Sequence, residues 1–217
     1  RQTKDGRWRE GVVMLRALMA QIPDAGLTGT QRHIDLLNAL STILAIGRGD
    51  LDERIALHEE RFRVARTLYG PKDGWYAYTL ADSVPTLRRS PRHLDRAEAI
   101  SREAVGIVDR VYRKPHLFAA VAYCNYAGLL VQRSRYEQAM PYYDRTIAID
   151  EALSRNDRHA QSCRHGRAHV RAALGQYEAA IADLAQDREM IAKLGAAVGS
   201  LKLDNCGLHA SVLLRSQ

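Results

Sequence analysis

Histidine and cysteine side chains occur at a few spacings that could support metal binding. His165 and His169 are four residues apart, so on a helix they share one face and could ligate a metal ion. Cys124 and Cys206 fall near the position of His165 in neighbouring copies of a repeating pattern described below. No acidic ligand and no Cys-x-x-Cys pair accompanies them. We therefore expect surface histidines and small buried cysteines, and no metal site.

Two other short sequences could be mistaken for functional motifs. Arg48-Gly49-Asp50 spells an adhesion tripeptide, but it lies between two expected helices, where glycine and aspartate are common turn residues. His58, Glu59 and Glu60 could support acid–base chemistry, but one face of an amphipathic helix explains them as well. The sequence contains no phosphate-binding loop, nucleophile elbow or zinc-protease motif. We expect no enzymatic activity and no cofactor.

Cysteine number and apolar content indicate the cellular environment. Three cysteines are too few and too far apart for a disulfide framework, and an odd number favours a reducing compartment. No apolar run approaches the ~18 residues needed to span a bilayer. We expect a cytoplasmic protein without a disulfide framework and without membrane contact in this part of the chain. Because the sequence begins at Arg1, we also expect a fragment of a longer protein.

The charge of the chain is unbalanced toward arginine. The formal net charge is +7, and only five of the 32 basic residues are lysine. Arginine binds carboxylate and phosphate groups through two hydrogen bonds at once, which lysine does not. Acidic protein segments and nucleic acid are therefore both partners to consider. The sequence has no dense basic run and no basic stripe interleaved with aromatic residues. Nucleic-acid binding is therefore disfavoured.

A sequence pattern returns at intervals of about 42 residues, which is typical of a helical repeat array. Residues 93–111, 135–153 and 176–194 align as three copies of one amphipathic helix. Each copy follows another segment with apolar residues at helical spacing, so each should be the second helix of a hairpin. One column of the alignment holds Leu94, Tyr136 and Tyr177, and another holds Ala97, Ala139 and Ala180.

The same scheme extends over the whole chain as a single repeat domain, 1–217. We expect about ten helices: an unpaired second helix at 7–22, pairs over 30–69, 74–113, 115–154 and 157–194, and an unpaired first helix at 198–215. Pro85 predicts a kink or a late start in its helix. Arg164 and Arg167 stand near positions that should be apolar, so the register there could slip by one residue. The uncovered end helices predict further repeats in the parent protein, or self-association through the ends.

One copy carries a recognisable pattern of large and small residues. This pattern resembles the tetratricopeptide repeat (TPR), and the long period is similar to that of the kinesin-light-chain type. The sequence Ala139-Met140-Pro141-Tyr142-Tyr143 resembles that subtype's A-x-P-L-Y motif, and residues 68–73 and 111–116 resemble its L-G-P-D-H-P turn. The resemblance implies an all-α, right-handed superhelical solenoid of antiparallel helix pairs, and a bacterial protein. The residues that carry the pattern are Tyr123, Tyr126, Ala127, Leu130, Ala139, Tyr143 and Thr146.

The same resemblance implies a function and a set of contact residues. Repeats of this family bind a protein or peptide segment in a concave groove lined by the first helices, and the arginines favour an acidic segment. Asn125 matches a position where many peptide-binding repeats carry asparagine, whose amide offers a donor and an acceptor to a peptide backbone. The alternative is a ligand- or peptide-sensing domain of a bacterial kinase or transcription regulator. The expected groove residues are Asp82, Ser83, Thr86, Arg89, Asn125, Gly128, Gln132, His165 and His169.

Overall fold

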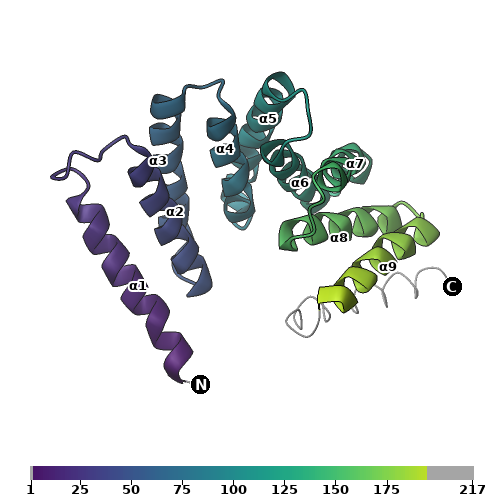
Figure 1. The fold of residues 1–217 in the computed structure, drawn as a ribbon, viewed down its shortest axis with the longest axis horizontal. Helices are drawn as coiled ribbons and strands as arrows, with labels where there is room; N and C mark the ends of the chain where they lie inside the picture. Colours follow the sequence, from purple (N-terminus) through teal and green to yellow (C-terminus); the bar gives the residue numbers. More distant parts are fainter. Residues whose placement is uncertain (1, 195–217) are drawn as a thin grey trace. The chain divides into compact units, whose positions relative to one another are not determined.

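The computed structural model describes the backbone of residues 2–194 and the side chains of residues 7–185, and every regular element within them is helical (Figure 1). The expected all-α class of paired helices is confirmed. The last expected helix, 198–215, lies outside the described residues. The elements are α1 (Gln2–Gln21), α2 (Gln31–Ile46), α3 (Leu51–Tyr69), α4 (Gly74–Leu87), the 3-10 turn η1 (Pro91–His93), α5 (Leu94–Val111), α6 (Leu117–Gln132), α7 (Tyr136–Ala152), α8 (Arg158–Ala173) and α9 (Tyr177–Leu194).

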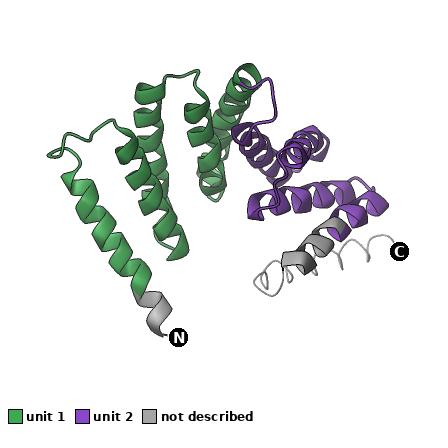
Figure 2. Cartoon of the chain, in the orientation of Figure 1, with its two compact units in different colours: residues 1–111 green, residues 112–217 purple. Residues whose placement is uncertain are grey.

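The chain divides into two compact units, residues 1–111 and residues 112–217 (Figure 2). In unit 1, each of α1 to α4 packs against the next helix along the chain, so that α2–α3 and α4–α5 form two hairpins. In unit 2, the hairpins are α6–α7 and α8–α9, and α6 also contacts α8. None of the helices in the described part of the chain is both long and apolar enough to cross a membrane.

Short polar side chains fix where several helices begin. Asp50 accepts a hydrogen bond from the backbone N–H of Glu53 at 2.7 Å, at the start of α3. Asp73 does the same for Trp75 at the start of α4, and Asp157 accepts from two backbone N–H groups at the start of α8. Each cap satisfies donors that the first helical turn leaves without a partner, and each contributes about 1 kcal/mol. These caps set which residues face the neighbouring helices.

Small residues let the paired helices approach closely. Ala127 and Ala139 are fully buried where α6 meets α7, and Ala168 and Ala180 are fully buried where α8 meets α9. A side chain added at Gly166 would overlap the phenol ring of Tyr143, which is itself buried. The repeating alanine column found in the sequence is therefore the close-contact column of the hairpins.

Two sequence irregularities are resolved by the packing. Arg167 and Arg164 do not shift the register of α8: Arg167 donates two hydrogen bonds to the buried carboxylate of Asp183, and Arg164 is buried and donates to Asn156. The late start expected from Pro85 is wrong, because α4 begins at its Asp73 cap and runs through Pro85 to Leu87. Pro85 lies in the last turn and its side chain is exposed, where a missing N–H disturbs little.

Candidate functional site

A cleft in unit 1 separates the exposed faces of α2 and α4. Its cavity holds about 70 Å³. Side chains of α2 form one wall, side chains of α4 form the other, and α3 lies beneath. The lining residues are Gln31, Ile34, Asp35 and Asn38 from α2, Arg61 and Tyr69 from α3, and Trp75, Tyr78 and Thr79 from α4.

Aromatic rings form the wall of the cleft on the α4 side. The rings of Tyr69 and Trp75 are stacked with centroids 6.2 Å apart, and Tyr78 meets Trp75 edge-on at 6.2 Å. Trp75 remains 51% exposed although it is one of only two tryptophans in the chain. Burial and the nearby carboxylate of Asp82 raise the pKa of the Tyr78 hydroxyl, so this phenol stays protonated. The wall presents large, rigid and partly solvated surface.

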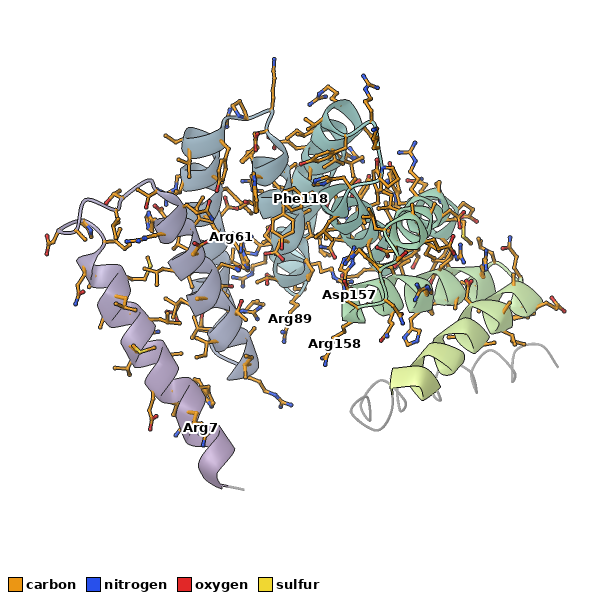
Figure 3. All side chains as sticks on the ribbon, in the orientation of Figure 1. Arg7, Arg61, Arg89, Phe118, Asp157 and Arg158 are labelled. Atoms are coloured by element: carbon orange, nitrogen blue, oxygen red, sulfur yellow. A yellow bond between two sulfur atoms is a disulfide. The ribbon has the colours of Figure 1, made fainter. Side chains whose placement is uncertain are left out.

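A buried arginine forms the base of the cleft. Arg61 is only 3% exposed and donates to the side-chain oxygens of Asp82 at 2.7 Å and of Asn38. It also donates to the backbone carbonyl of Thr79 at 3.3 Å. In Figure 3, Arg61 lies among the helices of unit 1. One guanidinium therefore holds together α2, α3 and α4 and fixes the orientation of the Asn38 amide.

The polar base continues inward beside Arg61. His58 Nε2 lies 3.1 Å from Ser41 Oγ and 3.2 Å from Thr86 Oγ1, and Arg54 donates to the same Thr86 oxygen at 3.0 Å. Burial, and then the positive charge of Arg61, lower the pKa of His58 to about 4. His58 is therefore neutral at pH 7, as a buried imidazole between two arginines should be. Because His58 is buried, a substrate could not reach it, and this disfavours the hypothesis that residues 58–60 perform acid–base chemistry.

The sequence-predicted residues of α4, together with Arg89 two places after its end, divide between surface and interior. Asp82 and Arg89 reach the surface, whereas Ser83 is fully buried and Thr86 is 5% exposed. Ser83 donates to the backbone carbonyl of Leu80, and Thr86 belongs to the His58 network. Their expected surface position is wrong because the outward face of α4 runs one residue away from the assumed register. The outward stripe is Trp75, Tyr78, Asp82, Pro85 and Arg89.

In unit 2, the predicted contact residues lie at or near the surface of α6 and α8. Asn125 and Gly128 are half-buried and Gln132 is exposed on α6. On α8, His165 is half-buried and His169 is exposed, with its ring edge-on to Tyr136 at 6.1 Å. None of them lines the cavity of about 330 Å³ between α6 and α7, which is bordered by Tyr126, Leu130, Gln138, Pro141, Tyr142 and Arg145.

Two of the three cysteines of unit 2 form a disulfide bond. Cys124 of α6 and Cys163 of α8 are joined with their Cα atoms 5.8 Å apart. This single bond is not a disulfide framework, but it removes the argument from cysteine number to a reducing compartment. The two residues are 39 positions apart, close to one repeat period, so equivalent positions of successive first helices bring them together. This spacing of about one repeat was the feature of the sequence from which the disulfide could have been predicted.

The same place contains the one metal-ligand set found among the described residues. The ligand atoms of Cys124, His159 and Cys163 all lie within 4.8 Å of one another. His159 Nδ1 is 3.6 Å from Cys163 Sγ. Because thiolates ligate metals and these sulfurs are bonded to each other, the set can bind a metal only after reduction. His165 and His169 are not part of it, and Cys206 lies outside the described residues.

The arrangement of helices can be compared with solved structures. Over 88% of this chain and 90% of the other, the fold matches a kinesin-light-chain-like protein of Podosopora anserina with nearly identical TPR-like repeats, with a TM-score of 0.68 and 16% identity. This chain has a TPR-like fold. BtubC (BKLC) from P. vanneervenii is similar over 99% of this chain and 84% of that chain, with a TM-score of 0.67 and 15% identity. Protein-family models and curated proteins give no match.

The TPR-like fold confirms the resemblance found in the repeat pattern. At this level of identity the likeness concerns the fold alone, so the function has to be argued from the chain's own surfaces. The cleft between α2 and α4 was missed in the sequence. The feature that could have predicted it is the outward face of α4. Trp75, Tyr78 and Asp82 recur there at helical spacing, one residue away from the buried apolar residues of the same helix.

Proposed function

We propose that this chain is a non-catalytic protein-interaction module that binds an extended segment of a partner protein in the α2–α4 cleft. The observation that carries this proposal is the combination of an exposed aromatic wall with a fixed amide on the opposite helix. Trp75 and Tyr78 face Asn38 and Gln31 across one cavity. Such a surface offers apolar anchoring for a side chain and hydrogen bonds for a backbone.

Asn38 is the residue best placed to bind a peptide backbone. Its side-chain oxygen accepts from Arg61, which fixes the amide plane and leaves its NH₂ group without a partner among the described residues. Asn38 is exposed on α2. A backbone carbonyl of a bound segment can accept from this NH₂ group without any requirement on the segment's side chains. The role first expected of Asn125 is thereby proposed for an asparagine of unit 1 as well.

The charges in the cleft favour an uncharged or basic segment rather than an acidic one. Asp35 contributes a carboxylate to the lining, and the positive charge of the lining arginine, Arg61, is already paired with Asp82. Gln31 donates to Asp35 at 2.7 Å, which keeps that carboxylate at the edge of the cleft. The preference for acidic partners that was expected from the arginine content is thus not supported at this site.

The remaining expected contacts belong to unit 2 and to the segment that follows α4. Asn125, Gln132, His165 and His169 are proposed to bind further residues of the partner, since each has surface on a first helix of unit 2. Arg89 lies apart from the cleft lining and is considered separately below.

A peptide selection tests the proposal. A random dodecapeptide phage library would be selected on the full chain, and the affinity of enriched peptides would be measured by fluorescence of Trp75 in a Trp8→Phe background. Asn38→Ala and Trp75→Ala should each weaken binding by at least tenfold. Because Trp75→Ala removes the fluorescent side chain, its binding would be measured by calorimetry. Arg63→Ala is the matched control, because Arg63 is 75% exposed and lies outside the cleft lining.

Two results would overturn the proposal. One is a failure to enrich any peptide above a scrambled library. The other is a set of enriched peptides that bind the Asn38 and Trp75 variants as tightly as the unchanged protein.

A further inference from the structure

A second cavity of unit 1 is lined by arginines, and none of the described residues that line it is acidic. It holds about 430 Å³ and lies where α2 ends and α3 begins, with the residue two places after α4 completing it. Its charged lining is Arg48, Arg54 and Arg89, and the rest is alanine, isoleucine, leucine and glycine. Three positive charges around one cavity repel one another unless an anion lies between them.

Of the three arginines, Arg54 is the most buried, so a bound anion would stabilise its charge most. It is only 7% exposed, and its one hydrogen bond is donated to the hydroxyl of Thr86. Its Nε is buried and has no hydrogen-bond partner in the part of the chain that the structure describes. No carboxylate among the described residues forms an ion pair with it. Burial, and then the charge of Arg89, lower the pKa of Arg54, which shows how poorly its charge is compensated.

Two other inward-facing arginines among the described residues are paired with carboxylates. Arg61 is bonded to Asp82, and Arg167 is bonded to Asp183 and Asp144. A buried charge left without a partner is strongly destabilising, and buried arginines are therefore normally paired. Arg54 departs from this rule at the wall of an open cavity, which is where a bound anion can supply the missing charge.

The turn that carries Arg48 does not itself require an arginine. Arg48 has a positive φ of 53° at the position after the α2 cap. Ser134 and Gly175 occupy the same place after α6 and α8, with φ of 57° and 76°. The backbone there accepts serine or glycine, so the arginine is explained by its side chain. Arg48 and Arg89 are exposed, and Figure 3 shows Arg89 extending from the chain just after α4.

We propose that this cavity binds a small phosphomonoester, with its phosphate held by Arg48, Arg54 and Arg89. Three guanidinium groups match the two negative charges and three oxygens of a phosphomonoester better than a single carboxylate. The volume exceeds that of a bare phosphate and falls in the range of small-molecule sites. Ile46 and Leu51 offer apolar surface to the organic part. Such a site fits the alternative function, a ligand-sensing domain. It shares no lining residue with the α2–α4 cleft.

Thermal unfolding and calorimetry with phenyl phosphate test this site on the full chain. Phenyl phosphate should raise the Tm of the unchanged protein and bind more tightly than inorganic phosphate or sulfate. Arg54→Gln and Arg89→Gln should each weaken binding by about tenfold or more, whereas Arg32→Gln, an exposed arginine of α2 outside the cavity, should leave it unchanged.

A second variant separates binding from folding. Without ligand, Arg54→Met should leave the Tm unchanged or raise it, because it removes an uncompensated buried charge. A large fall in Tm would assign Arg54 a structural role and overturn the proposal. Equal binding of phenyl phosphate and inorganic phosphate would overturn the phosphomonoester assignment. Absence of binding, or equal loss in the Arg32 control, would overturn the site.

Discussion

His58 Nε2 of α3 lies 3.2 Å from Thr86 Oγ1 of α4, in the interior of unit 1 and 28 residues away along the chain. The imidazole is buried at this position. Ser41 completes the contact from α2 at 3.1 Å. One neutral histidine thus connects three helices. The free energy of unfolding of unit 1 therefore depends on whether His58 is protonated.

Unit 1 should lose stability as the pH falls from 7 toward 4. Burial lowers the pKa of His58 to about 4, whereas an unfolded histidine titrates near 6.5, so between these values the unfolded chain binds more protons. The stability contributed by neutral His58 is complete above about pH 6.5 and is lost as the pH drops to about 4. The loss due to this residue should be about 2 kcal/mol at pH 4.5.

Urea unfolding followed by tryptophan fluorescence measures this effect, since Trp8 and Trp75 both lie in unit 1. His58→Gln keeps a hydrogen-bonding side chain that does not titrate, so its stability should fall about 2 kcal/mol less between pH 7 and pH 4.5. His93→Gln is the matched control and should follow the unchanged protein. Parallel pH dependence of all three proteins would contradict the prediction.

Asp183→Asn should destabilise unit 2 by about 3 kcal/mol. The Asp183 carboxylate is 3% exposed and lies 2.6 Å from Arg167 Nη2 and 2.8 Å from Arg171 Nη1. Although burial alone would lower the pKa of Arg167, Asp183 raises it above its usual value. Removing the carboxylate leaves two partly buried positive charges on α8. Glu178→Gln makes the same charge change at an exposed site of α9, and equal unfolding midpoints of the two variants would refute this account.

Two glycine-to-alanine substitutions should have opposite signs. Gly166→Ala places a methyl group against the buried ring of Tyr143, and overpacking of this kind costs about 1–3 kcal/mol. At Gly106 of α5 the nearest atom to an added Cβ is Arg110 Nη1 at 3.6 Å, so Gly106→Ala should stabilise by up to about 1 kcal/mol through helix propensity. Chemical denaturation followed by circular dichroism compares the two. A neutral Gly166→Ala would mean that the α7–α8 contact is looser than described.

The Cys124–Cys163 bond predicts the number of free thiols. After purification without reductant and unfolding in guanidinium, one of the three cysteines should react with a thiol reagent, and all three should react after reduction. Cys124→Ser/Cys163→Ser should unfold unit 2 more easily by about 2–4 kcal/mol, whereas Cys206→Ser should change the thiol count alone. Three reactive thiols before reduction would contradict the bond.

Much of the architecture could be predicted from the sequence because repetition is a local property. The alanine column of Ala97, Ala139 and Ala180 and the caps at Asp50, Asp73 and Asp157 each act within one hairpin or one helical turn. Spacing along the chain therefore carries the information needed to place helices and pair them. The same reasoning explains why a TPR-like fold could be expected from the repeat pattern alone.

The sequence by itself thus determined that this is an array of paired helices whose small residues lie at the hairpin contacts. Tertiary structure alone decided which polar residues face solvent and which face each other. It buried Ser83 and Thr86, joined Cys124 to Cys163, and gave Arg54 no acidic partner among the described residues. The physical reason is that one residue of rotation turns a helical side chain by about 100°. The periodic pattern fixes the buried face only to about that precision, whereas contacts between successive helices fix each side chain.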